Sequence, residues 1–292
     1  MILIISSILH MKNHIWSAII VVVFLFGTHF YIVSNRPSTE PASNEVVVGT
    51  PVPPPDPVPE PMPPATPEMI RKIEEERTYL LGHFDPAKSS EFIAIPLKYT
   101  MYQNQMYLRK ETYDAFLDMR AAALKDGVNL KIASAARNFN YQKNLWNNKW
   151  NGTTPVDGKN LAQTIPDGLE RFKKILEYSA APGTSRHHWG TDIDINTAEG
   201  AYFDVEPGIK EYNWLVENAS LFGFCQPYTA GRSLGYNEEK WHWSYVPVAG
   251  QLTKDYAKII TPADITGFEG ATYVQNLDLI NDYVLEINPL CR

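Results

Sequence analysis

Cysteine is scarce in this chain, which has two cysteines, Cys225 and Cys291, among its 292 residues. Neither belongs to a Cys-x-x-Cys pair, which argues against a zinc site built on cysteine. The two could form one disulfide if the domain lies in an oxidising compartment. Equally, Cys225 could be a buried free thiol and Cys291 a loose terminal one, and the sequence leaves both alternatives open.

Clusters of positive charge are also absent. The chain has 26 Lys and Arg residues against 33 Asp and Glu residues, a net charge of −7, and no run of basic residues. Binding to phosphates requires a basic surface, so the composition argues against nucleic acid as the main partner. The length suits one large domain or two small ones, and a hydrophobic content of 44% is enough for a sizeable core.

The long hydrophobic run that matters for location lies near the N-terminus. Residues 15–33 contain no Asp, Glu, Lys or Arg, and as a helix they would span about 28 Å, close to the thickness of a bilayer core. We predict that residues 1–36 are an N-terminal membrane anchor, a single membrane helix, or else a cleaved signal sequence. No small-x-small cleavage site follows the run, which favours the uncleaved anchor.

Either alternative places the rest of the chain outside the cytoplasm, on the periplasmic or outer face of the membrane, or secreted after cleavage. The first ten residues are also apolar, and Met11 followed by Lys12 looks like an ordinary start. The sequence therefore does not decide whether translation begins at Met1 or Met11.

A proline-rich linker follows, because residues 37–67 hold 12 of the 22 prolines. Proline lacks the backbone N–H and fixes φ, so this segment cannot form a helix or a central strand. We predict an extended polyproline spacer, in which 17 residues reach about 50 Å. Such a spacer would hold the following domain away from the membrane.

The composition becomes globular from about residue 68, and helices and strands alternate irregularly after it. We expect helices at 67–82, 107–127, 167–178 and 208–224, and strands at 128–137, 190–196 and 240–246. The rest of 140–180 is rich in Asn, Trp and Lys, which indicates loops. The regular strand–helix rhythm of a parallel sheet is absent, so we predict one α+β domain over 68–292.

The segment SRHHWGTDIDIN, residues 185–196, has the residue types of a metal site. A strand places Asp192 and Asp194 on the same face, and Gly190 allows the backbone to bend so that His187 approaches them. Farther along, EKWH at 239–242 offers a third ligand in His242. A catalytic zinc needs three protein ligands and one open position for water, and histidine nitrogen and carboxylate oxygen are suitable ligands.

These motifs resemble a known family. The pattern SxHxxGxxxD, followed by ExWH with its His242 48 residues after Asp194, is similar to the VanY-like branch of the zinc D-Ala-D-Ala carboxypeptidases and dipeptidases of peptidoglycan metabolism. These peptidases share a fold with lysostaphin-type enzymes and the hedgehog signalling domain. The resemblance covers about residues 76–250 and implies a small central antiparallel sheet with flanking helices.

The resemblance also implies roles for individual residues. It implies that Zn²⁺ is bound by His187, Asp194 and His242. Glu239 would be the general base that takes a proton from the metal-bound water. The segment SAARNFNYQ at 134–142 resembles the family's strand-end segment, in which Arg137 would hold a substrate carboxylate or polarised carbonyl. Gln142 and Ser185 would also face the substrate.

Two positions stay open at this point. The family usually has a small residue where this chain has Asp192, which could orient a ligand histidine or be an alternative ligand. The spacing selects His187, but His188 is its neighbour and remains an alternative. Residues 251–292 carry no motif of the family.

The functional hypothesis is a zinc D-alanyl-D-alanine carboxypeptidase acting on peptidoglycan stem peptides. An L,D-carboxypeptidase or a peptidoglycan endopeptidase would share the same motifs, because pocket shape decides which bond is cut. A non-catalytic zinc-stabilised cell-wall-binding domain is the alternative from another class. The presence of Glu239 argues against it, since a purely structural zinc site needs no base.

Overall fold

The computed structural model describes residues 66–292. The chain divides into two units, Met1–Pro61 and Met62–Arg292, and the second is described below. The predicted anchor at 1–36 and nearly all of the proline-rich linker at 37–67 lie outside the described residues. Among the helices of residues 66–292, none has the length and apolar character needed to span a bilayer.

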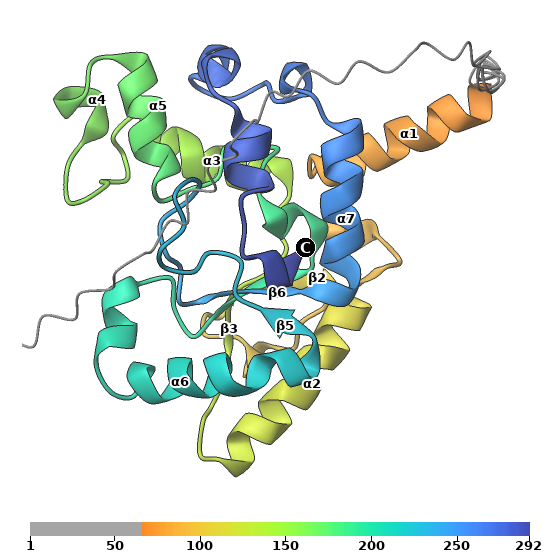
Figure 1. Cartoon of the computed structure of the whole chain (residues 1–292), viewed down its shortest axis with the longest axis vertical. Coiled ribbons are helices and arrows are strands. Elements are labelled where there is room, and N and C mark those ends of the chain that lie inside the picture. Colours follow the sequence, from red (N-terminus) through yellow and green to blue (C-terminus); the bar gives the residue numbers. More distant parts are fainter. Residues whose placement is uncertain (1–65) are drawn as a thin grey trace, which may run out of the picture. The chain divides into compact units, whose positions relative to one another are not determined.

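A four-stranded antiparallel sheet lies at the centre of the unit (Figure 1). Its strands, in spatial order, are β3 (Ile132–Ser134), β4 (Asp192–Ile195), β6 (His242–Tyr245) and β5 (Phe224–Cys225). A second sheet has two antiparallel strands, β1 (Phe92–Ala94) and β2 (Tyr107–Arg109). Helices flank the sheets, so the predicted α+β architecture with a small central antiparallel sheet is confirmed.

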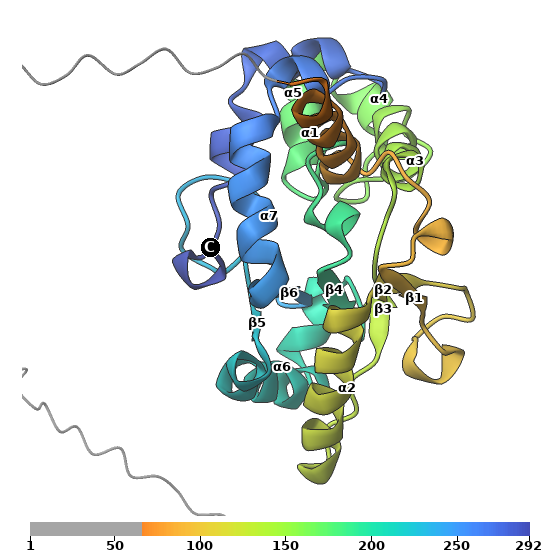
Figure 2. The same cartoon turned by 90° about the vertical axis from the view of Figure 1, so that its right-hand side faces the viewer.

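The two faces of the central sheet differ in chemistry because strand residues alternate between faces. Ile193 and Ile195 of β4 and Trp243 of β6 belong to one hydrophobic core, which also contains residues of α2 (Lys110–Lys125) and α6 (Gly208–Asn218). Both helices lie against that face (Figures 1 and 2). The polar residues between the apolar ones therefore point to the opposite face.

A second core lies on the polar side of the sheet. It contains buried side chains such as Trp146, Phe172, Trp189 and Tyr256. Trp189 comes from the turn before β4, and the other three come from the helical layer on that side (Figure 2), made by α1 (Pro67–Leu80), α3 (Phe139–Trp150), α5 (Gly168–Leu176) and α7 (Val246–Ile259). A short helix, α4 (Leu161–Thr164), precedes α5. The central sheet thus has one hydrophobic core on each side, and its polar residues face the second core.

The prediction of loops at 140–150 is wrong, because α3 occupies this segment. Asn138 caps the helix by accepting a hydrogen bond from the Tyr141 N–H at 2.9 Å. Phe139, Gln142 and Trp146 are its buried residues, and Trp146 Nε1 donates to the Glu269 carbonyl at 2.9 Å. With so few buried positions among polar ones, the helix is stabilised by tertiary contacts more than by its own apolar pattern.

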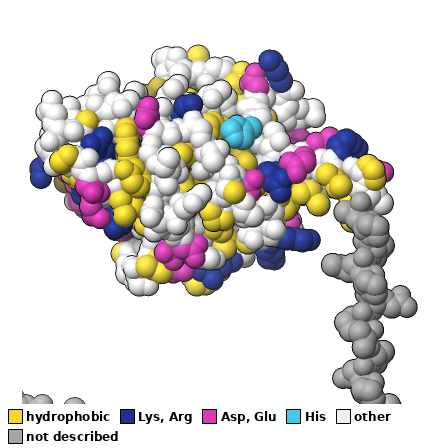
Figure 3. Space-filling model, turned by 90° about the horizontal axis from the view of Figure 1, so that it is seen from above, with side chains coloured by type: hydrophobic (Ala, Val, Ile, Leu, Met, Phe, Trp, Pro, Cys, Tyr) yellow, Lys and Arg dark blue, Asp and Glu magenta, His cyan; other side chains and the backbone are white. Residues whose placement is uncertain are grey.

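Charged side chains of both signs are interspersed over the face seen in Figure 3. Helix α1 illustrates the pattern, with ion pairs one turn apart between Arg71 and Glu75 at 2.6 Å and between Lys72 and Glu68 at 3.1 Å. These pairs are more than half exposed. Solvent screening keeps each one's contribution to stability at about 0.5 kcal/mol or less.

The C-terminal residues 251–292, which carry no family motif, complete the fold. After α7 the chain forms short turns whose apolar residues, among them Val274, Val284 and Ile287, enter the second core. Cys291 then forms a disulfide with Cys225 of β5, 66 residues away in sequence. Of the two alternatives for the cysteines, the structure therefore has the disulfide, which ties the C-terminus to the edge of the sheet.

Replacing both cysteines by serine, as Cys225→Ser with Cys291→Ser, should lower the free energy of unfolding by up to about 4 kcal/mol. The reason is that the cross-link restricts the unfolded chain over a separation of 66 residues. Urea denaturation of the purified protein measures the change. Reductant should shift the midpoint of the wild type and leave that of the double variant unchanged; equal midpoints for all samples would contradict the cross-link.

Candidate metal centre

His187 lies in a 3₁₀ turn, Arg186–Trp189, that leads into β4. Gly190 ends the turn with φ at 70°, and a side chain there would collide with the ring of Phe92 at 2.3 Å. Glycine is therefore required both for the left-handed conformation and for the close approach. The predicted bend is present, and it directs the His187 side chain over the polar face of the sheet.

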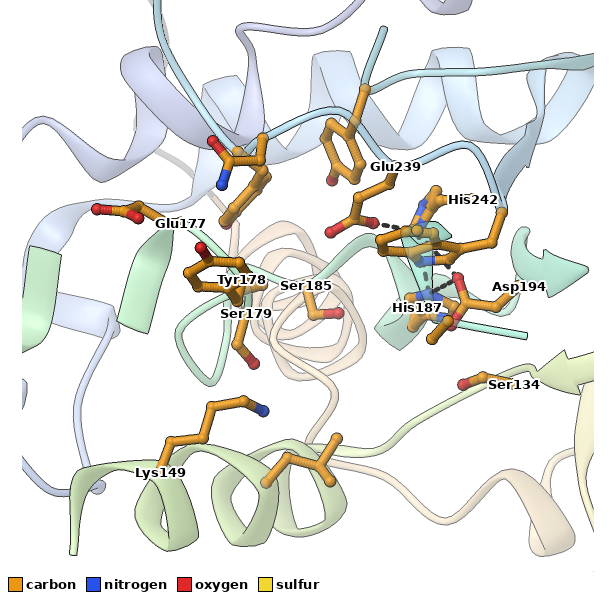
Figure 4. A pocket seen from close by; sticks show the side chains of 18 of the residues that line it. Ser134, Lys149, Glu177, Tyr178, Ser179, Ser185, His187, Asp194, Glu239 and His242 are labelled. Atoms are coloured by element: carbon orange, nitrogen blue, oxygen red, sulfur yellow. Dashed lines mark hydrogen bonds and ion pairs between the residues drawn. The ribbon is translucent and has the colours of Figure 1, made fainter. Parts of the chain in front are cut away.

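The three predicted ligands meet on that face (Figure 4). Asp194 of β4 lies directly opposite His242 of β6 in the antiparallel register, which places their side chains next to each other. His187 Nε2 is 3.2 Å from His242 Nδ1, and both nitrogens are 3.3 Å from Asp194 Oδ1. All three residues are buried, and their ligand atoms lie within 4.8 Å of one another.

Hydrogen bonds on the outer side of each imidazole determine which nitrogen faces the centre. His187 Nδ1 donates to the Ala135 carbonyl at 2.8 Å, which leaves Nε2 with a free lone pair. His242 Nε2 donates to Asp192 Oδ2 at 2.9 Å, which leaves Nδ1 with a free lone pair. Two imidazole lone pairs and a carboxylate directed at one point repel one another unless a cation lies between them.

The residues present therefore fit a divalent metal. Asp194 Oδ1 is buried and has no hydrogen-bond partner among the described residues, as expected of an oxygen whose partner is an ion. Two imidazole nitrogens and one carboxylate oxygen form the ligand set of many catalytic zinc sites, in which the fourth position stays open. Zinc is the metal that this donor set suits best.

The electrostatics of the pair His242 and Asp194 favour a positive charge at the centre. Burial lowers the pKa of His242, but the hydrogen bond with Asp192 and the nearby carboxylates of Asp194 and Glu239 outweigh burial and hold that pKa well above its ordinary value. Burial raises the pKa of Asp194, but the two histidines outweigh it, so this pKa lies far below its usual range. Asp194 is therefore ionised at neutral pH.

Asp192 supports His242 and is not an alternative ligand. Its Oδ2 accepts from His242 Nε2 and from Arg186 Nε at 3.0 Å, and its Oδ1 accepts from Ser244 Oγ at 2.8 Å. Arg186 is fully buried and also donates to Ser244 Oγ at 2.7 Å and to Thr253 Oγ1 at 2.9 Å. Both oxygens of Asp192 are thus occupied, and its role is to orient the histidine.

The rest of this network was not predicted from the sequence. Ser244 shares the His242 face of β6 by strand alternation, so that signal was available. No sequence signal pointed to Arg186 or Thr253. A buried arginine next to a motif histidine cannot be told from a surface arginine by sequence, and Thr253 lies on α7, outside the motif segments.

His188 has a different role from its neighbour. Its Nε2 accepts from the Gly183 N–H at 3.0 Å, and its Nδ1 donates to the Arg137 carbonyl at 2.6 Å. Both ring nitrogens are therefore used within the protein, and burial lowers the pKa of His188 to about 3, which keeps the ring neutral. Between the two adjacent histidines, the structure places His187 at the centre.

A pocket of about 840 Å³ opens onto the metal centre, and Glu239 lies in its wall. The Glu239 backbone is held by hydrogen bonds to the Tyr228 carbonyl at 2.9 Å and from Gln226 Nε2 at 3.0 Å. Its Oε2 lies 3.3 Å from His242 Nδ1, the nitrogen that faces the centre. The carboxylate therefore stands beside the open side of the centre (Figure 4).

The remaining predicted residues, Arg137, Gln142 and Ser185, line the same pocket. Arg137 Nε is buried without a hydrogen-bond partner, and no carboxylate within residues 66–292 forms an ion pair with Arg137. Gln142 Nε2 donates to the Ala180 carbonyl at 2.8 Å, while its Oε1 has no partner in the described part of the chain. Each predicted site residue thus lies at one cavity.

Comparison with known proteins agrees with this geometry. The family model described as VanY, D-alanyl-D-alanine carboxypeptidase, matches residues 105–248, which contain all seven predicted site residues. The match covers 144 of the 292 residues, just under half of the chain. The VanY match begins before α2 and ends at the start of α7, so it covers the whole central sheet.

Two relatives of the VanY-like chain illustrate the similarity. The putative carboxypeptidase YodJ of Bacillus subtilis is 26% identical over 206 residues, which are 68% of this chain and 66% of the relative. A D-alanyl-D-alanine carboxypeptidase of Enterococcus faecalis is 32% identical over 146 residues, which are 48% of each chain. The chain thus spans just under two thirds of the first relative and about half of the second.

Solved structures of similar proteins include the zinc complex of a vancomycin-resistance D,D-pentapeptidase, VanY. It is 27% identical with a TM-score of 0.39, and the alignment covers 56% of this chain and 88% of that chain. The LD-carboxypeptidase LdcB is 23% identical with a TM-score of 0.44, covering 61% of this chain and 81% of that chain.

The two adjacent histidines permit a matched test of the metal centre. His187→Gln should reduce bound zinc from about one ion per chain to a small fraction, because it removes one of three ligands. His188→Gln should retain the zinc and lose about 1–3 kcal/mol of stability, since a buried hydrogen bond is broken. Zinc content by atomic absorption and unfolding by urea measure the two effects; loss of zinc in the His188 variant alone would reverse the assignment.

Proposed function

We propose that this protein is a zinc-dependent D-alanyl-D-alanine carboxypeptidase, which removes the terminal D-amino acid from peptidoglycan stem peptides. The observation that carries the proposal is the placement of Glu239 in the pocket wall beside a centre of three buried ligands. A site with three protein ligands and an open side toward a cavity is catalytic in type. The match to the VanY family model and the activity named for the Enterococcus relative support the substrate class.

The chain's own residues account for the steps of hydrolysis. Zinc, when bound, lowers the pKa of a water molecule to about 7 and polarises a carbonyl oxygen. Glu239 accepts the proton of the attacking water and returns it to the leaving amine. Arg137 has an unpaired guanidinium Nε in the pocket, and it binds the terminal carboxylate of the substrate or the carbonyl that is attacked.

The support around the ligands keeps this arrangement in place. Asp192 and the Ala135 carbonyl hold the two histidines in the orientation that directs a lone pair inward. Gln142 holds the pocket wall through the Ala180 carbonyl, and Ser185 lines the same pocket. Such preorganisation spares the enzyme a reorganisation cost during the reaction.

The activity test uses muramyl pentapeptide and, separately, tetrapeptide, with products read by mass spectrometry. The zinc-loaded protein should remove one D-alanine from the pentapeptide, and a chelator should stop it. Glu239→Gln should lower kcat by about 10²–10⁴-fold, because the general base is lost, while zinc stays bound.

Other outcomes identify the alternatives. Cleavage of the tetrapeptide alone would indicate an L,D-carboxypeptidase, and cleavage of cross-linked muropeptides alone would indicate an endopeptidase. Stoichiometric zinc with no cleavage of any of these substrates would contradict the proposal and indicate a non-catalytic cell-wall-binding domain. Full activity in the Glu239 variant would overturn the assignment of the base.

We further propose that the domain lies outside the cytoplasm, held at the membrane by residues 1–36 through the proline-rich linker. The support is the uncharged run at 15–33 and the disulfide between Cys225 and Cys291, since disulfides form and persist in oxidising compartments. This location also matches the proposed substrate, which lies beyond the membrane.

Fractionation of bacteria that express the full chain tests this location. The protein should remain in the membrane pellet after an alkaline carbonate wash. Protease added to spheroplasts, in which the outer side of the cytoplasmic membrane is accessible, should digest the domain. A variant lacking residues 1–36 should appear in the soluble fraction. A shortened protein in the medium would instead indicate cleavage of a signal sequence, and a soluble full-length protein would contradict both alternatives.

A further inference from the structure

The pocket continues past the metal centre along one face of α3. Gln142, Leu145 and Lys149 line it together, and their spacing of three and then four residues puts them on the same face of the helix. From Gln142 to Lys149 the helix rises about 10 Å. Figure 4 shows the Lys149 side chain pointing into the pocket, with Tyr178 and Ser179 near it and Glu239 farther across.

The ammonium of Lys149 has no acidic partner within residues 66–292, although acidic side chains line the same pocket. Asp157 and Glu177 are both paired with another lysine, Lys174, at 2.7 Å and 2.6 Å. Glu239 contacts His242 instead. Lys149 is therefore a pocket cation without an ion-pair partner in the described part of the chain, and three of the carboxylates that line the pocket are engaged elsewhere.

The surroundings make an unpaired charge at this position costly. Lys149 is half-buried, and burial together with the positive charge of Arg137 lowers its pKa to about 8, although Glu239 acts in the opposite direction. At neutral pH the side chain still carries its charge for most of the time. Two cations, Arg137 and Lys149, thus face one cavity, and a ligand with two carboxylates would satisfy both.

We propose that Lys149 is a specificity residue that binds a second carboxylate of the substrate, on the side chain of a stem residue that stays after cleavage. The proposal rests on the proposed function. Lys149 lies about 10 Å along α3 from Gln142, the length of about three residues of extended peptide, and the proposal places its partner carboxylate on the retained stem, not on the leaving residue. The enzyme should therefore prefer stems whose diamino acid carries a free side-chain carboxylate.

Two pentapeptides that differ by one carboxylate test the preference. Their third residue is diaminopimelate in one and lysine, which has hydrogen in place of the carboxylate, in the other. The zinc-loaded full chain should hydrolyse the diaminopimelate peptide with a kcat/KM about 10-fold or more higher, the size of one charge-assisted hydrogen bond. Lys149→Met should bring the ratio close to one, mainly through KM, and Lys149→Arg should keep most of the preference.

Lys143→Met is the matched control, because Lys143 lies on the same helix but is not among the pocket-lining residues. It should retain the wild-type ratio. Equal kcat/KM values for the two peptides in the wild type, or an equal loss on both in Lys149→Met, would overturn the inference while leaving the carboxypeptidase activity established.

Direct binding separates this inference from the proposed activity. If neither peptide is hydrolysed, the proposed function fails, and calorimetric titration of both peptides into the wild type and Lys149→Met then tests the subsite alone. Preference for the diaminopimelate peptide in the wild type and its loss in the variant would support the subsite. Equal affinities in both proteins would overturn it.

Discussion

The metal centre depends on one buried hydrogen bond, which His242 Nε2 donates to Asp192 Oδ2 at 2.9 Å. This bond decides which nitrogen of His242 faces inward, and without it the ring could present either one. Asp192 can accept it because Arg186 compensates its charge inside the protein. A buried ion pair is favourable only when its remaining hydrogen-bonding groups are also satisfied, and hydroxyl groups of Ser244 and Thr253 do this for Arg186.

This network links parts of the chain that are far apart in sequence. Thr253 lies on α7, Arg186 in the turn before β4, and Ser244 on β6. The helix that follows the last family motif is therefore connected to the metal centre by hydrogen bonds, and the disulfide at Cys291 secures the segment after that helix. The C-terminal region contributes no ligand, but it supports the residues that orient one.

The division of the sheet into an apolar and a polar face explains where the pocket lies. The apolar face is covered by α2 and α6 and is buried in a hydrophobic core. The polar face carries Asp194 and His242 and lies below the layer that contains α3 (Figure 2). The pocket between sheet and helix thus joins a metal centre, built from two strands and the turn before β4, to the cationic groups of Arg137 and Lys149 before and along α3.

Most of the candidate site was predictable because its signals are local. The strand at 190–196 was recognised from alternation, and the alternation itself places both aspartates on one face. Helix α3 was missed because only a few of its residues are buried, and the contacts that stabilise it, such as Trp146 with Glu269, join residues far apart in sequence. The same limit applied to Lys149, whose position in the pocket depends on this helix.

The sequence by itself determined the residue types of the metal centre, their order, the α+β class and the two faces of β4, since strand periodicity and motif spacing are properties of short segments. Only the tertiary structure decided between His187 and His188, gave Asp192 its supporting role, paired Cys225 with Cys291 and left Lys149 without a partner. Each of these depends on which atoms of distant segments come within hydrogen-bonding or ionic contact, and packing of the whole domain sets those distances.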